Sequence, residues 1–248
     1  GVFIKSIEKA LFEGEADIAV HSMKDMESND TKGTKIAAVL PREDRRDALV
    51  SKWNSLELLP YEAKIGTASV RRKAVISSMR PDLKINLLRG NVNSRIDRLN
   101  SGEYDAIILA VAGLKRLNIK TNYTKLNTNI MPPAPMQGAI AIQIIDNEEN
   151  KNDLLPILKK INCRNTYDCI KAERALLVEL DGTCKTPISA MASLVSNENI
   201  EIVGKLFSLD GKKSFVSSVV GPRKTAINLG KQVAKILLKK CGGRNFFC

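Results

Sequence analysis

The chain has 248 residues, of which 44% are hydrophobic and 4% aromatic. This length suits one large domain or two to three small ones, and the composition excludes collagen, coiled coil and disorder. No apolar run approaches the roughly 18 residues of a membrane span, and the first residues lack the apolar centre of a signal peptide, so we expect a soluble protein. The formal charge of +12 is concentrated in residues 64–95 (eight basic, one acidic) and 221–248 (seven basic, none acidic). Such regions indicate an anionic partner, which could be nucleic acid, a membrane surface, or a polycarboxylate or phosphate ligand.

The first part of the chain predicts one helix and two strands. Apolar residues recur at helical spacing over residues 3–11 and stop before Gly14, and short apolar runs at 16–20 and 35–40 are typical of buried strands. The proline and charge cluster at 41–44 breaks this pattern and is a candidate domain crossing.

From residue 63 onward, strands and helices alternate. We expect strands at 63–66, 84–88 and 105–111, helices at 69–79 and 92–99, and a turn at 113–116. Strands that alternate with helices of about ten residues predict βαβ units and a parallel sheet.

A second candidate crossing is the proline-rich stretch 131–135, followed by a strand at 139–145 that we expect to return to the first domain. After it the pattern predicts a small α+β domain. Its elements are helices at 165–180 and 225–240 and strands at 188–195, 200–207 and 215–220, and a further helix is expected before it at 152–161. The fold class expected is therefore α/β, with two hinged α/β domains and a small C-terminal α+β domain. The domains are 1–41 with 139–160, then 44–132, then 162–248.

Basic residues follow three of the predicted strands. Ser69 is placed to cap a helix whose first turn carries Arg71 and Arg72, and Arg89 with Arg95 follow the next strand. Arg116 comes after the third. Open α/β sheets bind ligands at the carboxyl ends of their strands, and arginine recognises carboxylates with two parallel bonds. Taken singly, each of these motifs is more commonly the solvated start of a helix. Three of them at the same edge of a sheet favour an anion-binding site.

Asp25 lies just past a strand end beside Lys24 and would share that rim. Nearby positive charge favours an ionised carboxylate, which suits it to stabilise a cation or accept N–H bonds. A turn-forming aspartate is the commoner alternative. The only histidine, His21, is expected to be packed or hydrogen-bonded and not catalytic.

The five cysteines are odd in number, widely spaced and contain no C-x-x-C, which argues against a disulfide framework or metal site and favours a reducing, cytoplasmic setting. Cys184 lies in a Gly- and Pro-marked loop beside Lys185, where a thiol could be a nucleophile or attachment point. Most free cysteines, however, are simply small buried hydrophobes.

These segments, in this order, resemble porphobilinogen deaminase, also called hydroxymethylbilane synthase. The matching segments are ADIAVHSMKDM (16–26), LPREDRRDALVS (40–51), GTASVRR (66–72), LLRGNVNSR (87–95), GEYDAIILAVAGLKRL (102–117), PAPMQGAIAIQ (133–143), AERALL (172–177) and DGTCKTPI (181–188). The resemblance implies two periplasmic-binding-protein-like α/β domains. It also implies a transferase that joins four porphobilinogen units head to tail into hydroxymethylbilane, with release of ammonia, in tetrapyrrole (heme) biosynthesis.

The resemblance also implies roles for individual residues. A dipyrromethane cofactor would be held by a thioether to Cys184, and Asp25 would be the catalytic aspartate, offsetting the azafulvene cation left by ammonia. Cofactor contacts would come from Lys24, Ser69, Arg71, Arg72 and Arg89, and substrate contacts from Arg95 and Arg116. We expect a cytoplasmic monomer that binds porphobilinogen, with no metal, nucleic acid or membrane partner.

The sequence departs from the family pattern at several positions. Met136 and Thr183 stand where glycine is usual, and both add bulk where a tight turn is expected. The other departures are Ala68, Gln143, Glu27 and Arg45. The chain opens without the family's first strand–helix–strand region, so we expect an N-terminally truncated first domain with an unpaired sheet edge and poor cofactor loading.

One alternative remains open on the residues alone: a non-catalytic anion-binding protein of the periplasmic type. It would share the hinged domains and the arginine rim, but it would need neither Cys184 nor Asp25. Nucleic-acid binding would use the positive charge, but the few aromatic residues show no stacking pattern near the basic runs.

Overall fold

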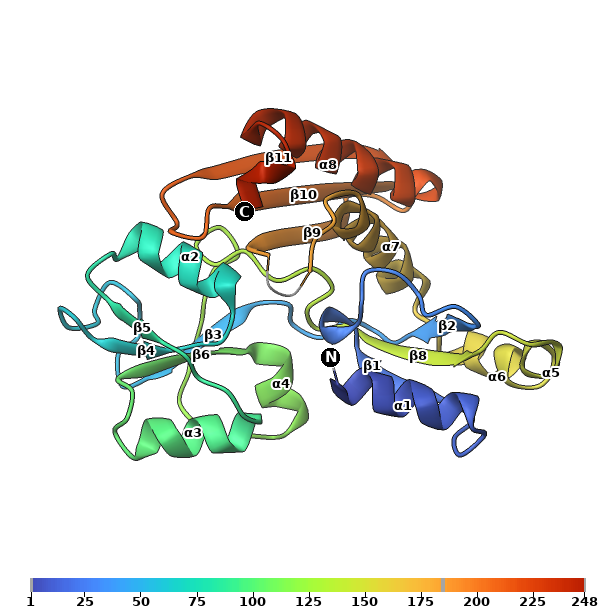
Figure 1. Ribbon diagram of the computed structural model, residues 1–248, viewed down its shortest axis with the longest axis horizontal. Coiled ribbons are helices and arrows are strands. Elements are labelled where there is room, and N and C mark those ends of the chain that lie inside the picture. The colour runs from blue at the N-terminus through green and yellow to red at the C-terminus, as the bar shows by residue number, and fades with distance from the viewer. Residues whose placement is uncertain (1, 184–185, 248) are drawn as a thin grey trace.

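Three separate β-sheets organise the chain in the computed structural model, which describes residues 2–183 and 186–247 (Figure 1). The strand orders are β1-β8-β2, β5-β4-β6-β3-β7 and β11-β10-β9. The mixed α/β class expected from the sequence is confirmed. None of the helices in the described part of the chain is long and apolar enough to cross a membrane.

The first sheet is antiparallel, and its middle strand comes from far along the chain. Its strands are β1 (Ala19–Ser22), β2 (Thr34–Val39) and β8 (Ile140–Ile145), and its helices are α1 (Val2–Phe12), α5 (Glu148–Asn152) and α6 (Leu154–Ile161). The strand expected at 16–20 begins later, because Ala19 and His21 are the residues that alternate inward. His21 is buried and hydrogen-bonded through Nε2 to Gln143 Oε1 at 2.8 Å, as its sequence context predicted.

The second sheet is mixed. Its strands are β3 (Asp47–Ser51), β4 (Lys64–Gly66), β5 (Lys84–Asn86), β6 (Ala106–Ala110) and β7 (Thr124–Lys125), and its helices are α2 (Val70–Met79), α3 (Val92–Asn100) and α4 (Val111–Arg116). The expected parallel pairing holds for β4 with β5 and β6, but β3 runs antiparallel to β6 and β7. The turn expected at 113–116 is wrong, because these residues continue the helix α4.

The third sheet is antiparallel and is covered by two helices. Its elements are α7 (Arg164–Glu179), β9 (Ile188–Leu194), β10 (Asn199–Phe207), β11 (Ser214–Pro222) and α8 (Ala226–Cys241). Helix α8 lies on α7 so closely that a Cβ at Gly230 would sit 2.1 Å from the carbonyl oxygen of Ala172. Glycine is therefore required there for the two helices to pack.

The hydrophobic core of the third sheet continues into the first. Met23 and Val39, on or beside the first sheet, belong to the same buried cluster as Ile170, Leu176 and residues of β9, β10 and α8. The second sheet has its own two clusters, one on each face. Short turns of 3₁₀ helix complete the described structure: η1 (Met23–Asp25), η2 (Arg223–Thr225) and η3 (Arg244–Phe247).

Candidate active site

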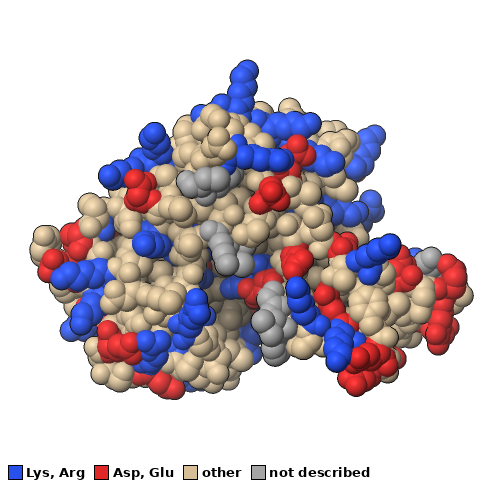
Figure 2. Space-filling view, in the orientation of Figure 1, with Lys and Arg blue, Asp and Glu red and all other residues tan. Residues whose placement is uncertain are grey.

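A cleft of about 600 Å³ lies where the three sheet units meet. Its walls come from η1, from the start of α2, from the crossing that includes Ala134 to Gln137, and from the loop after α7. Figure 2 shows the molecule hollowed between its two lower lobes, with acidic and basic atoms at the bottom of the hollow. A cleft between domains is a usual place for a ligand site.

Lys24 and Asp25 reach this cleft because their neighbours anchor the η1 turn. Met23 is fully buried and Met26 nearly so, and the backbone N–H of Met23 donates to the carbonyl of Ala139 at 3.1 Å. The two charged residues between them line the cleft, where Asp25 is exposed. Burial, and then the positive charge of Arg72, lower the pKa of Lys24.

The start of α2 brings Ser69, Arg71 and Arg72 to the cleft. Ser69 caps the helix as expected, with its Oγ accepting from the backbone N–H of Arg72 at 3.4 Å. Arg71 and Arg72 also line the cleft, although they are only 3% and 6% exposed. Both guanidiniums are therefore held mostly inside the protein, behind the cleft surface.

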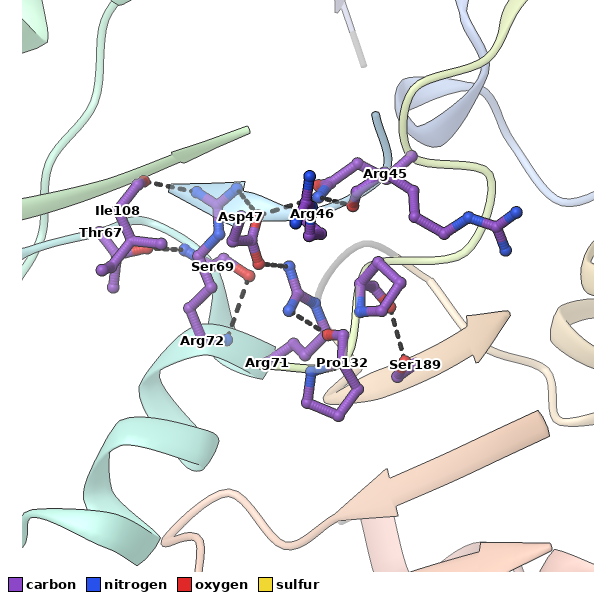
Figure 3. Close-up of polar contacts among 12 residues, drawn as sticks. Arg45, Arg46, Asp47, Thr67, Ser69, Arg71, Arg72, Ile108, Pro132 and Ser189 are labelled. Carbon is purple, nitrogen blue, oxygen red and sulfur yellow. Dashed lines mark hydrogen bonds and ion pairs between the residues drawn. The ribbon is translucent and has the colours of Figure 1, made fainter. Parts of the chain in front are cut away.

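Asp47 explains how two arginines can be buried side by side (Figure 3). Its carboxylate is fully buried and accepts from Arg71 Nη2 at 2.8 Å and from Arg72 Nη2 at 2.7 Å. A third donor, Gln137 Nε2, reaches the same carboxylate at 2.9 Å. Burial alone would raise the pKa of Asp47, but the two guanidiniums outweigh it and hold that pKa well below its usual range.

Backbone carbonyls accept further hydrogen bonds from the two arginines. Arg71 Nη1 donates to the carbonyl of Pro132, and Arg72 Nη1 donates to that of Ile108 at 2.7 Å. The Nε atoms of Arg71 and Arg72 are buried without a hydrogen-bond partner. An unpartnered buried donor costs free energy, so burial of these two arginines is only partly compensated by the bonds to Asp47 and the carbonyls.

Asp47 and Gln137 were missed by the sequence analysis. Asp47 leads a short apolar strand directly after a charged segment, and the arginines that it contacts are 24 and 25 residues further along the chain. A lone charge at the head of a buried strand is the one signal that could have pointed to it.

Of the other predicted arginines, only Arg95 borders the cleft. Its Nε donates to the carbonyl of Gly90 at 2.8 Å, and burial, followed by the nearby charge of Arg72, lowers its pKa. Arg89 is exposed and Arg116 donates to the carbonyl of Gly138 at 2.8 Å. Neither is among the described residues that line the cleft.

The predicted attachment residue, Cys184, lies outside the described residues. The residues around it border the cleft: Gly182 and Thr183 on one side and Thr186 on the other. This loop is tied to the η1 side by a bond from Ser28 Oγ to the carbonyl of Gly182 at 3.4 Å. The cleft thus offers four cations and lies next to the loop that contains the predicted attachment residue, a set of groups that fits a dipyrromethane with its carboxylates.

Met136 forms part of the same wall in an unusual backbone conformation. Its φ is +61°, in the left-handed region that favours glycine, and its side chain is buried. The backbone N–H donates to Glu173 Oε2 at 2.6 Å, while Arg42 pairs with both oxygens of that carboxylate. The predicted bulk at a tight turn is therefore present, and the buried Arg42–Glu173 pair holds the turn.

The fold and the cleft are typical of a protein that binds an anionic ligand between α/β units, with the exposed carboxylates of Asp25 and Glu27 also on the cleft wall. The family model described as "Porphobilinogen deaminase, dipyromethane cofactor binding domain" matches residues 1–153, and "Porphobilinogen deaminase, C-terminal domain" matches residues 167–239. The chain belongs to the porphobilinogen deaminase family.

Curated relatives agree over nearly the whole chain. Porphobilinogen deaminase of Rickettsia bellii is 45% identical over 240 residues, which cover 96% of this chain and 79% of the relative. The enzyme of Lawsonia intracellularis is 40% identical over 96% of this chain and 77% of the relative. The enzyme of Clostridium novyi is 41% identical over 97% of this chain and 81% of the relative.

The identification as a transferase of tetrapyrrole biosynthesis with a dipyrromethane cofactor is confirmed, and the non-catalytic anion-binding alternative is not favoured. Among solved structures, the second substrate-binding domain of a putative amino-acid ABC transporter from Streptococcus pneumoniae overlaps with a TM-score of 0.42 and 18% identity, covering 63% of this chain and 69% of that one.

Proposed function

We propose that this chain assembles hydroxymethylbilane from four porphobilinogen units on a dipyrromethane held by Cys184. One observation carries the proposal: the residues that flank Cys184 border the same cleft as Asp25 and four cationic side chains. When bound, the dipyrromethane supplies the pyrrole end to which the first substrate unit is joined.

The cations of the cleft suit this substrate because each pyrrole unit carries two carboxylates. Lys24, Arg71 and Arg72, with Ser69, are proposed to hold the carboxylates of the cofactor, and Arg95 those of the substrate. Their support is the position of all five residues on the cleft wall. The cofactor role of Arg89 and the substrate role of Arg116 rest on the family resemblance alone.

Asp25 is proposed as the catalytic residue. It is an exposed carboxylate that lines the cleft beside four cationic side chains, and a carboxylate there can offset the positive charge that develops on the substrate when ammonia leaves. The same oxygens can accept pyrrole N–H bonds and orient the ring.

The attachment is tested by the intact mass of the protein purified from cells. We expect a fraction of the protein to carry an excess of one dipyrromethane, in line with the poor cofactor loading predicted above, and Cys184→Ser should remove this adduct together with activity. Cys163→Ser is the matched control, because this thiol lies at the start of α7, and it should keep both. An adduct that persists in Cys184→Ser would overturn the assignment.

The catalytic role is tested separately by turnover. Asp25→Asn keeps the size of the side chain and removes its charge. Loss of one well-placed electrostatic group typically costs about 3 kcal/mol, so turnover should fall on the order of a hundredfold. Because Asp25 is exposed, the urea midpoint should stay unchanged; near-normal turnover would refute the role.

We also propose that the three sheets mark three domains, 1–41 with 139–160, 44–132 and 162–248, in a cytoplasmic monomer. The pairing of β8 between β1 and β2 supports the discontinuous first domain. Cys163, Cys169 and Cys241, in the described part of the chain, are free thiols, which suits a reducing compartment. Sedimentation equilibrium at several concentrations tests the monomer.

A further inference from the structure

A second cavity, of about 470 Å³, lies between β2, α7 and the first half of α8. Figure 1 shows the loop that follows β1 rising toward α7 beside this region. Ser28 borders both this cavity and the catalytic cleft, so the two are separated by the loop after Asp25. The volume falls within the range of about 300–1,000 Å³ that is usual for small-molecule sites.

The floor of this cavity is apolar. Met23, Val39 and Ile170 form its buried part, and Val178 and Ile227 continue it toward solvent, where Ile227 is 48% exposed. Apolar surface exposed in a concave site gains free energy when an apolar body covers it. The floor therefore favours an aliphatic or aromatic group.

The rim of the cavity is cationic. Asp30 is the only acid among the described residues that line it, against four cations: Lys35, Lys171, Arg174 and Lys231. Lys35 is paired with Asp146 at 2.9 Å and Lys171 lies over the Tyr167 ring. The net positive charge of the rim favours an anionic group on the ligand.

Arg174 provides a specific position for that group. Its Nη1 donates to Asp30 Oδ1 at 2.7 Å and its Nη2 to the carbonyl of Glu27 at 3.2 Å. Its Nε is buried and has no hydrogen-bond partner. The guanidinium thus has an unused donor, and the carboxylate that it does hold belongs to an exposed loop residue.

We propose that this cavity binds an amphipathic monoanion, a molecule with an aromatic or aliphatic body and one carboxylate or sulfonate. The body covers the apolar floor, and the anionic group bonds to Arg174 in competition with Asp30. This site is distinct from the catalytic cleft, and the proposal does not depend on the roles given to Cys184 or Asp25.

Because the anionic group competes with Asp30 for Arg174, removal of the Asp30 charge should strengthen binding of an anionic probe. The probe is 8-anilinonaphthalene-1-sulfonate, titrated into the full chain and followed by fluorescence, with the uncharged analogue N-phenyl-1-naphthylamine in parallel. Asp30→Asn should tighten binding of the sulfonate about fivefold, and Arg174→Gln should weaken it about fivefold, since partly exposed charge pairs are worth up to about 1 kcal/mol. The uncharged analogue should bind both variants equally well.

Matched variants locate the site. Lys231→Glu should weaken binding of the sulfonate, whereas Lys239→Glu, with the same charge change two turns further along α8, should not. Arg95→Leu, in the catalytic cleft, should also leave it unchanged. The proposal is overturned if Asp30→Asn fails to tighten binding of the sulfonate, or tightens that of the uncharged analogue equally, which would indicate loosened structure. Equal effects of the two lysine variants, or loss of binding in Arg95→Leu, would likewise overturn it.

Discussion

Asp47→Asn is the substitution that tests the buried charge cluster most directly. Asparagine keeps the size of the side chain but removes the negative charge between Arg71 and Arg72. Its amide nitrogen would also replace one of the oxygens that accept from the guanidiniums, so one arginine would face a donor. Both cations would remain buried without compensation.

The magnitude follows from the burial of all three side chains. Removing one partner of a buried pair costs about 3–5 kcal/mol, because the remaining charge is left in a poorly polarisable interior. Asp47 is fully buried, and the arginines that would lose it are 3% and 6% exposed. We therefore expect the free energy of unfolding to fall by at least about 3 kcal/mol, a large share of the 5–15 kcal/mol that is typical of a domain.

Urea unfolding followed by circular dichroism measures this loss, and Asp82→Asn is its control. Asp82 also holds an arginine, with Arg80 Nη2 at 2.6 Å, but both side chains of that pair are partly exposed to solvent. Water can replace the lost bonds there, so the effect should be much smaller. Equal losses in the two variants would refute the argument from burial.

The same cluster predicts a pH dependence. The pKa of Asp47 is held below its usual range in the folded protein, while it returns to about 3.9 in the unfolded chain. The folded state therefore binds a proton less readily, and the stabilisation is fully present above about pH 5. It declines as the pH falls below about 4, by up to about 1.4 kcal/mol per pH unit. The stability difference between the parent and Asp47→Asn should narrow in acid, and a constant difference from pH 7 to pH 3 would contradict the mechanism.

Further substitutions test the cleft and the chain crossing beside it. Arg95→Leu should raise the KM for porphobilinogen by at least about tenfold, since a hydrogen bond to a charged group is worth about 1.5–3 kcal/mol. Arg89→Leu, outside the cleft, should raise the KM less, and steady-state kinetics measures both values. Met136→Gly removes the strain of a left-handed backbone, about 1 kcal/mol, but leaves a cavity that costs about 2–5 kcal/mol. The free energy of unfolding, measured in urea, should therefore fall by about 1–4 kcal/mol. A rise would mean that the backbone strain is the larger effect. Gly138→Ala should lower the melting temperature, because φ is +87° and the new Cβ would sit 2.5 Å from the carbonyl oxygen of Glu43. An unchanged melting temperature would show that the backbone here can shift to accommodate the methyl group.

The sequence predicted most of the elements whose signal is local. The helix at Val70–Met79 begins where Ser69 caps it, and the helix at Arg164–Glu179 and the three strands after it follow their apolar spacing. Two strands were missed for a physical reason. Asp47–Ser51 directly follows a run of charged residues, and Thr124–Lys125 is too short to show a period.

The site was predicted in part. Lys24, Asp25 and Ser69 could be placed because each follows a strand end, although β1 and β4 belong to different sheets and the residues meet at the cleft between them and not at one sheet edge. The contacts of Arg71 and Arg72 could not, because Asp47 is brought to them by the antiparallel pairing of β3 with β6. The order of strands in a sheet cannot be predicted from the spacing of residues, so this contact could not be predicted either. Arginines predicted to face a ligand freely are therefore largely engaged by the protein itself.

The fixed charge of the cleft has a consequence for the length of the product. Among the described residues at its wall, Lys24, Arg71, Arg72 and Arg95 are opposed by Asp25 and Glu27, and Asp47 lies behind the two central arginines. Each porphobilinogen adds two negative charges to the bound chain, while the number of cations stays constant. The attraction available to each new unit declines as the chain grows, and repulsion among the bound carboxylates rises. Under the function proposed above, growth in this cleft is therefore electrostatically self-limiting, and we expect the last unit to be held more weakly than the first.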